Sequence, residues 1–342
     1  APTDEVTVID DLVAGATPGI VASPGPRYFG FVTGGATPAA LAADVMTSVW
    51  DQNTAFAVMS PAAAVIEEVA AGWLCDLLGL PDDASVGFVT GAQMANVTCL
   101  LAARHRVLDH TGWDDRTQGL IGAPPVRIVA GDEAHVTLHV ALRYIGLGAP
   151  NVIVPSDGQG AMRADALAEA LAGPPQPTIV CAQAGNVNTG ASDPFDALAD
   201  VCAQAGAWLH VDGAFGLWAA AAPGRRHLVA GHERADSWAT DGHKWLNVPY
   251  DSGMAITRDP EAHRAAMSMT AAYLVTDAAM RDGSDWAPES SRRARAIPRH
   301  SSKRRSNRPV TALRCCSCST ASPTRTTWAR ACAVPTPQAS QP

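Results

Sequence analysis

Residues 177–212 read PTIVCAQAGNVNTGASDPFDALADVCAQAGAWLHVD, and this stretch decides the fold. Two short runs rich in β-branched and other apolar residues, 177–182 and 207–212, flank a segment at 194–205 with helical periodicity. Strands that alternate with amphipathic helices pair in parallel, because each helix carries the chain back across the sheet. The stretch therefore predicts an α/β fold with helices on both faces of a sheet.

The same alternation extends to both sides of this stretch. Further strand-like runs lie at 127–130, 151–155, 236–240 and 253–257, and helical stretches at 93–108, 135–146 and 163–172. Nearer the N-terminus, Pro61 suits the first turn of a helix over roughly 62–79, and residues 5–22 and 36–50 also show helical spacing. Together these patterns predict a mostly parallel central sheet preceded by an N-terminal helical segment.

Length and composition allow one large domain and a smaller piece, since the 342 residues are 47% hydrophobic. The formal net charge of -8 is unevenly distributed. Residues from 291 onward contain ten Arg and one Lys but no acid, which leaves 14 basic against 33 acidic residues in 1–290, about −19. This acidic body argues against nucleic-acid binding.

The cysteines follow the same division. Those of the body lie in apolar contexts that suit small buried side chains in a reducing cytoplasm, namely Cys75, Cys99, Cys181 and Cys202. The CCxC cluster at 315–318 matches no common zinc pattern, so no metal is expected. Neither an apolar run of membrane-spanning length nor a secretory signal pattern is present, which predicts a soluble, cytoplasmic protein without membrane contact.

Polar residues follow several of the predicted strands. Asp212 ends the run at 207–212, His135 comes after the run at 127–130, and the segment 241–244 (DGHK) follows 236–240. A turn of small residues at 89–96 (VTGAQMAN) precedes a helix and points backbone N–H groups at an anion. Ligands collect at the carboxyl ends of parallel strands, so an acid, an imidazole, an amine and an anion-binding turn meet at one edge.

This combination describes a site for pyridoxal phosphate. A partly desolvated lysine amine condenses with the aldehyde of the cofactor, and a carboxylate keeps the ring nitrogen protonated. An imidazole stacks on the ring, and amides at a helix start hold the phosphate. Taken singly, Asp212 is as well explained as a turn residue, His135 as a helix-start residue and Lys244 as a solvated lysine. Their order and shared edge favour one site.

The residues also resemble a known family. HVDGAFG (210–216) and ADSWATDGHKWLNVPYDSG (235–253) are similar to the group II pyridoxal phosphate-dependent decarboxylases, which include the aromatic amino acid, histidine and glutamate decarboxylases. The segment 26–53 resembles the N-terminal part of that family, and 285–295 resembles its approach to the small C-terminal domain. The resemblance covers roughly 10–297 and implies the type I fold of pyridoxal phosphate enzymes.

The resemblance assigns roles to individual residues. Lys244 matches the Schiff-base lysine, Asp212 the partner of the ring nitrogen, and Ala214 the side chain packed on the ring face opposite His135. It implies Lys244, His135 and Asp212 as the catalytic residues.

The phosphate site departs in part from the family pattern. The resemblance gives the phosphate-loop positions to Gly91, Ala92 and Gln93, where the family more often has a Ser-Gly-Gly-Ser turn, and a phosphate contact to His243. Asp241 stands where several members carry Asn, and its charge would repel phosphate, so it is left out of the expected site. Asn186 and Val187 replace paired threonines, and the segment 29–35, which lines the substrate side chain in the family, has small residues here.

The implied activity is decarboxylation of an L-amino acid to its amine and CO₂ by a homodimer. Alternatives are an aminotransferase or carbon–carbon lyase on the same fold, or an inactive, truncated cofactor-binding protein. The expected organisation is an N-terminal helical segment (1–55), a cofactor-binding large domain (56–283) and an aberrant C-terminal tail (284–342), with the small domain missing.

From about residue 297 the resemblance ends, and the sequence becomes rich in Arg, Ser, Pro, Thr and Cys. A disordered basic tail and an arm for nucleic acid or membrane are two interpretations. The abrupt change favours a third, a GC-rich gene read out of frame.

Overall fold

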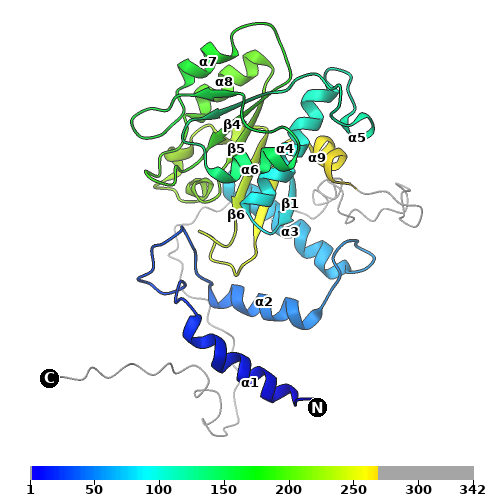
Figure 1. Ribbon diagram of the computed structural model, residues 1–342, viewed down its shortest axis with the longest axis vertical. Coiled ribbons are helices and arrows are strands. Elements are labelled where there is room, and N and C mark those ends of the chain that lie inside the picture. Colours follow the sequence, from blue (N-terminus) through cyan, green and yellow to red (C-terminus); the bar gives the residue numbers. More distant parts are fainter. Residues whose placement is uncertain (1, 269–342) are drawn as a thin grey trace, which may run out of the picture. The chain divides into compact units, whose positions relative to one another are not determined.

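The computed structural model describes residues 2–268, and a seven-stranded sheet forms the centre of this part (Figure 1). The order of the strands across the sheet is β1-β7-β6-β5-β4-β2-β3. In chain order the strands are β1 (Ser85–Val89), β2 (Arg127–Gly131), β3 (Val152–Val154), β4 (Thr178–Gln183), β5 (Trp208–Asp212), β6 (Ser237–Asp241) and β7 (Gly253–Thr257).

Five neighbouring strands of the sheet are parallel, and the parallel pattern ends at β7. β2, β3, β4, β5 and β6 pair in parallel, whereas β7 is antiparallel to both β6 and β1. A parallel return needs a crossover of a dozen or more residues, usually with a helix. The loop 242–252 between β6 and β7 is shorter than such a crossover and contains no helix, so the chain turns back beside β6 in the opposite direction. This loop carries Lys244.

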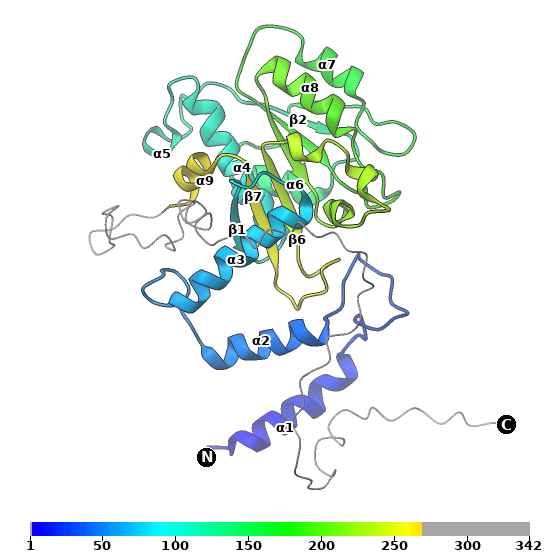
Figure 2. The same cartoon turned by 180° about the vertical axis from the view of Figure 1, so that it is seen from behind.

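Helices cover both faces of the sheet (Figures 1 and 2). One face packs against α3, α7 and α8, and the other against α4, α6 and α9. The described helices are α1 (Glu5–Ala16), α2 (Pro38–Trp50), α3 (Pro61–Leu78), α4 (Ala92–Asp109), α5 (Asp115–Gln118), α6 (Val136–Tyr144), α7 (Ala164–Leu171), α8 (Phe195–Ala205) and α9 (Pro260–Met267), with short 3-10 helices at Thr17–Gly19, Gly216–Ala221, Arg226–Val229 and His232–Arg234.

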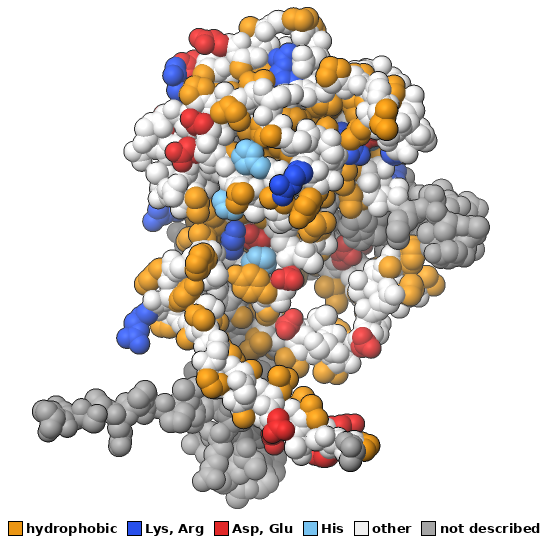
Figure 3. Space-filling view, in the orientation of Figure 1, with side chains coloured by type: hydrophobic (Ala, Val, Ile, Leu, Met, Phe, Trp, Pro, Cys, Tyr) orange, Lys and Arg blue, Asp and Glu red, His pale blue; other side chains and the backbone are white. Residues whose placement is uncertain are grey.

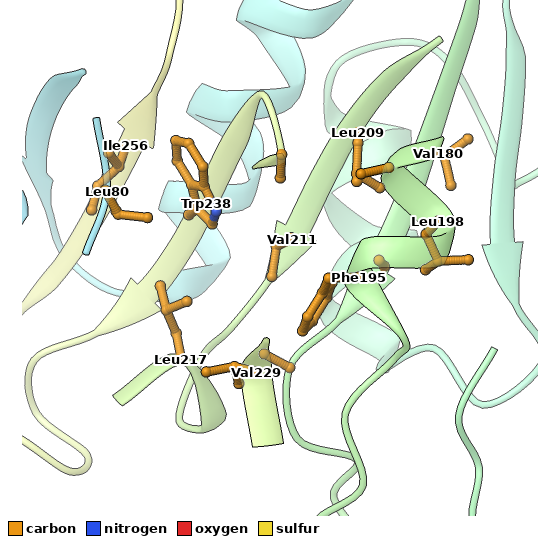
Figure 4. Close-up of a cluster of buried hydrophobic side chains, with 14 of the residues drawn as sticks. Leu80, Val180, Phe195, Leu198, Leu209, Val211, Leu217, Val229, Trp238 and Ile256 are labelled. Carbon is orange, nitrogen blue, oxygen red and sulfur yellow. The ribbon is translucent and has the colours of Figure 1, made fainter. Parts of the chain in front are cut away.

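Side-chain alternation along the strands divides the core into two layers. In β5, Leu209 and Val211 face the α8 side, whereas Trp208 faces the α4 side. Figure 4 shows the first layer, in which Phe195 of α8 and Val211 of β5 lie close together. Because successive residues of a strand point to opposite faces, His210 and Asp212 share the α4 side with Trp208. Two polar side chains are thereby placed under a helix.

The predicted elements agree closely with the observed ones. The strand-like runs at 127–130, 151–155, 177–182, 207–212, 236–240 and 253–257 correspond to β2 through β7, and Pro61 occupies the first turn of α3 as expected. The helical spacing over 5–22 is too long, since α1 ends at Ala16 and a 3-10 turn containing Pro18 follows. Proline cannot donate to the helix ladder, which explains the early end. The predicted tail from 284 lies outside the described residues, and the three-part division of the chain stays a prediction.

The four cysteines expected to be buried in the body are buried and free, namely Cys75, Cys99, Cys181 and Cys202. No described helix is long and apolar enough to cross a membrane. The N-terminal helices differ from the rest, because neither α1 nor α2 has a buried residue. Their apolar side chains therefore face outward.

Core packing gives a direct test of the sheet–helix layer. Phe195 is fully buried at the start of α8, so Phe195→Ala should lower the free energy of unfolding by about 3–5 kcal/mol through lost contacts and a cavity. Chemical denaturation followed by circular dichroism measures this change. Ile121→Ala is the control, because Ile121 is 97% exposed and its loss should cost under about 0.5 kcal/mol. Equal effects would contradict the described packing.

Candidate active site

The carboxyl edge of the parallel strands holds a cavity of about 220 Å³. Four residues predicted from the sequence to meet there do so: His135, Asp212, Ala214 and Lys244 all line it. They come from the segment before α6, the end of β5, the residues after it, and the β6–β7 loop. The remaining lining residues are Phe31, Val32, Gln183, Gly185, Val187 and Phe215.

Asp212 is the buried acid of the cavity. The residue is 5% exposed, and its carboxylate accepts a hydrogen bond from Asn96 Nδ2 at 3.0 Å on Oδ2 and one from the Ala214 N–H at 3.3 Å on Oδ1. Burial raises the pKa of Asp212, while the donors from Asn96 and Ala214 and the nearby His135 and Lys244 act in the opposite direction. Asp212 can therefore serve as the charge partner of a protonated ring nitrogen.

Lys244 is held by the turn that follows β6. Its Nζ lies 2.9 Å from Asp241 Oδ2, and its side chain is 22% exposed. The N-terminal segment fixes this loop, because Gly35 N–H donates to Asn247 Oδ1 and Thr37 N–H to the Asn247 carbonyl, both at 2.9 Å. A side chain at Gly34 would collide with the Lys244 carbonyl, so only glycine allows this close approach.

The predicted phosphate turn is joined to the lysine loop through Asp241. Asp241 Oδ1 accepts a hydrogen bond from the Ala92 N–H at the start of α4, and His243 Nε2 lies 3.3 Å from the same oxygen. His243 Nδ1 accepts from the Ser252 N–H at 3.0 Å, which leaves Nε2 as the protonated nitrogen that faces Asp241. The amide of Ala92, expected to face phosphate, is thus engaged by a carboxylate of the chain itself.

Gln93 is the donor in this turn that lacks a partner. Its Nε2 is buried and makes no hydrogen bond among the described residues, one position into α4. An unpaired buried donor is costly, and at a helix start it is suited to an anion. The amine of Lys244 and the carboxylate of Asp212, which both line the cavity, fit pyridoxal phosphate, whereas residues 91–93 and His243 are not among the lining residues.

His135 stands at the entrance to α6 as its N-cap. Its Nδ1 accepts from the Thr137 N–H at 3.3 Å and lies 2.7 Å from Thr137 Oγ1. Its backbone N–H donates to Gln183 Oε1 at 3.2 Å, which ties the histidine to the end of β4. The imidazole is therefore both a helix cap, the ordinary interpretation, and a wall of the cavity.

The segment 29–35 reaches the cavity through Phe31 and Val32, which have left-handed φ values of 57° and 53°. A left-handed backbone is unusual for residues with large side chains, and here it occurs at the two residues of the segment that line the cavity. Val187 lines the same space, while Asn186 is buried and caps its own turn by accepting from the Asn188 N–H.

Sequence reasoning missed two residues of the site. Asp241 was left out because of its charge, yet it contacts Lys244 and the start of α4. Asn96 was passed over, although a polar residue inside a buried stretch of helix is a signal for a polar partner. It supplies the shorter of the two hydrogen bonds to the Asp212 carboxylate.

Comparison with known proteins decides the family. The model of the pyridoxal-dependent decarboxylase conserved domain matches residues 1–302. The chain belongs to this family. The resemblance inferred from 210–216 and 235–253 is thereby confirmed, and pyridoxal phosphate is the cofactor of the family.

Relatives of this decarboxylase-family chain act on several amino acids. Tryptophan decarboxylase 1 of Oryza sativa subsp. japonica is 30% identical over 297 residues, covering 80% of this chain and 56% of the relative. Acidic amino acid decarboxylase GADL1 of Mus musculus is 29% identical over 255 residues, covering 73% and 46%. The chain spans about half the length of the curated relatives it matches.

Solved structures confirm the predicted fold class. The structure of Oryza sativa TDC with PLP and tryptamine aligns with a TM-score of 0.74 at 26% identity, covering 86% of this chain and 65% of that one. Mouse CSAD gives the same TM-score at 25% identity. The described sheet is that of the type I fold of pyridoxal phosphate enzymes.

The turn at 91–93 can be tested by crowding it. A Cβ at Gly253 would collide with the backbone of Gly91, so Gly253→Ala should displace the turn and weaken cofactor binding by about tenfold, roughly 1.4 kcal/mol. Titration of the cofactor-free chain with pyridoxal phosphate measures the affinity, and a thermal melt reports folding. Gly72→Ala on α3 is the control, since nothing lies within 4 Å of its Cβ. Unchanged affinity in a displaced turn would exclude 91–93 as the phosphate site.

Proposed function

We propose that this chain catalyses pyridoxal phosphate-dependent decarboxylation of an L-amino acid to the corresponding amine and CO₂. The observation that carries the proposal is the convergence of Lys244, Asp212 and His135 on one cavity from the β6–β7 loop, the end of β5 and the segment before α6. The family match over 1–302 supports the reaction class, as do relatives named as decarboxylases of tryptophan and of acidic amino acids.

Each part of the cofactor would be contacted by a side chain of suitable chemistry. Lys244 supplies the amine that binds the cofactor covalently, and Asp212 the carboxylate that pairs with the ring nitrogen. His135 and Ala214 both line the cavity and would pack against the two faces of the ring. Residues 91–93 and His243 would hold the phosphate, with Gln93 offering its unpaired donor.

Pyridoxal phosphate, when bound, supplies an electron sink that accepts the electron pair released as the α-carboxylate leaves as CO₂. The chain maintains this capacity by keeping an anion, Asp212, at the ring nitrogen in a desolvated position where Coulombic attraction is strong. Asp241 orients the Lys244 amine by accepting from Nζ. The apolar side chains of Phe31, Val32 and Val187 line the same cavity.

Replacement of the lysine tests this assignment. The sequence contains two lysines, Lys244 and Lys303, so Lys303→Ala is a matched control for Lys244→Ala. Borohydride reduction of the loaded protein followed by peptide mass spectrometry should place the cofactor on Lys244. Lys244→Ala should not form this adduct. Its rate of CO₂ release should fall by at least about a thousandfold, since the covalent route is removed. Covalent labelling that persists in Lys244→Ala would refute the assignment.

The product distinguishes the proposed reaction from its alternatives. CO₂ and an amine from one of a panel of L-amino acids establish the decarboxylase. A keto acid without CO₂ would identify an aminotransferase instead. Protein that binds the cofactor on Lys244 but turns over none of the panel would identify an inactive binding protein.

We further propose that the chain works as a homodimer in the cytoplasm. The buried, unpaired cysteines of the described body suit a reducing compartment. Along α2, Leu41, Val45 and Val49 form a stripe at four-residue spacing and are 54%, 55% and 74% exposed. Figure 3 shows hydrophobic side chains on the surface of α1 and α2. A second copy of the chain would remove this apolar surface from water.

A charge in the stripe tests the homodimer. Val45→Asp should shift the mass measured by light scattering from two chains of 35.5 kDa to one at micromolar concentration, because an unpaired carboxylate would be buried in an apolar contact. Thr47→Asp carries the same charge on the opposite side of α2 and should leave the mass unchanged. A monomeric wild-type protein, or dissociation by both variants alike, would contradict the proposed interface.

A further inference from the structure

A continuous chain of buried polar side chains leads from the interior of the sheet to Asp212. Trp208 Nε1 donates to Ser237 Oγ at 2.9 Å, and Ser237 Oγ lies 2.9 Å from His210 Nδ1. His210 Nε2 lies 2.9 Å from Asn96 Oδ1, and Asn96 Nδ2 donates to Asp212 Oδ2 at 3.0 Å. None of the five residues is more than 6% exposed.

Strand geometry places these groups in line. Trp208, His210 and Asp212 are alternate residues of β5 and share its α4 side. Ser237 pairs directly with His210 across the β5–β6 ladder, and Asn96 descends from α4 onto the same side. The chain of contacts is thus built into the register of two strands and one helix.

The two groups at the ends of this hydrogen-bonded series, Trp208 and Asp212, determine the direction of every hydrogen bond in it. The Trp208 indole donates and cannot accept, whereas an ionised Asp212 accepts and cannot donate. Asn96 therefore turns its amide N–H toward Asp212 and its oxygen toward His210, which requires a proton on His210 Nε2. Neutral His210 then accepts on Nδ1 from the Ser237 hydroxyl, whose oxygen accepts from Trp208. Each link has one donor and one acceptor in this arrangement.

We propose that Asn96 and His210 are positioning residues that keep Asp212 ionised and aimed at the cofactor ring nitrogen, an inference that rests on the role of Asp212 proposed above. If His210 could not donate, the Asn96 amide would be free to invert and present its oxygen to Asp212. Two facing oxygens need a proton between them, so Asp212 would then be stabilised as a neutral acid. A neutral Asp212 no longer favours a charged ring nitrogen.

The electrostatics of the buried groups agree with this arrangement. Burial raises the pKa of Asp212, and the Asn96 hydrogen bond is the largest of the influences that lower it. Burial also lowers the pKa of His210 to about 3, so its imidazole is neutral at neutral pH and has one proton to place. The contact of Nε2 with Asn96 Oδ1, which can only accept, places the proton on Nε2.

The test compares two replacements of His210 in the full chain loaded with pyridoxal phosphate labelled with ¹⁵N in the ring. His210→Leu removes the donor at similar bulk and should shift the ¹⁵N resonance toward that of an unprotonated pyridine, with about tenfold weaker cofactor affinity. His210→Gln retains an amide N–H for Asn96 and should return both values toward wild type. A merely structural role would not make the glutamine variant recover the ring-nitrogen signal.

Ser237→Ala gives a second, smaller perturbation that does not remove the imidazole. It removes the hydroxyl that donates to Nδ1 and so weakens Nε2–H as a donor to Asn96, and the ¹⁵N resonance should move in the same direction as in His210→Leu but by less. Thr257→Val is the matched control, because Thr257 pairs with Ser237 across the β6–β7 ladder but is not part of the chain. Thermal melts of the unloaded variants report folding independently.

The outcomes separate this inference from the proposed function. If Asp212→Asn leaves the ¹⁵N resonance unchanged, the role of Asp212 itself is wrong. If Asp212→Asn shifts the resonance while His210→Leu and Ser237→Ala match wild type, the positioning role is overturned and that of Asp212 stands. Equal shifts in His210→Leu and His210→Gln also overturn it. Where His210→Leu does not fold, the comparison of Ser237→Ala with Thr257→Val decides.

Discussion

A carboxylate buried at the end of the central strand constrains much of the surrounding structure. Asp212 ends β5, which has β4 on one side and β6 on the other, and α4 covers it. An ionised carboxylate in this position requires hydrogen-bond donors and positive charge nearby. Asn96, the Ala214 N–H and the proximity of Lys244 meet this requirement from three different elements. Their placement fixes how α4 and the β6–β7 loop lie against β5.

The antiparallel β7 has a functional consequence. Lys244 follows the carboxyl end of β6, and because β7 returns directly beside β6, the rest of the loop 242–252 stays at that edge as well. A crossover helix at this point would have carried the following residues to the other end of the sheet. The N-terminal segment then closes on the loop through Gly35 and Thr37. Residues more than two hundred positions apart thus hold one lysine.

The sequence predicts those features that depend on local pattern. Apolar runs separated by amphipathic helices indicate the strands, and the rule that ligands bind at carboxyl ends brings Lys244, Asp212 and His135 to one place. The direction of β7 is not encoded in its hydrophobic pattern, which is the same for either orientation. The contact of His210 with Asn96 joins residues 114 positions apart, and it depends on how α4 is rotated over β5. Such a pairing becomes visible in three dimensions alone.

Asp241 illustrates how charge at a site depends on neighbours rather than on residue type. Considered with phosphate alone, its carboxylate is repulsive, and the sequence argument excluded it for that reason. In the structure it accepts from the Ala92 N–H and lies against Lys244 Nζ and His243 Nε2, so donors surround it. These contacts join the start of α4 to the lysine loop. The Ala92 amide at the helix start therefore holds Asp241 in place, while the buried Gln93 Nε2 beside it has no partner among the described residues.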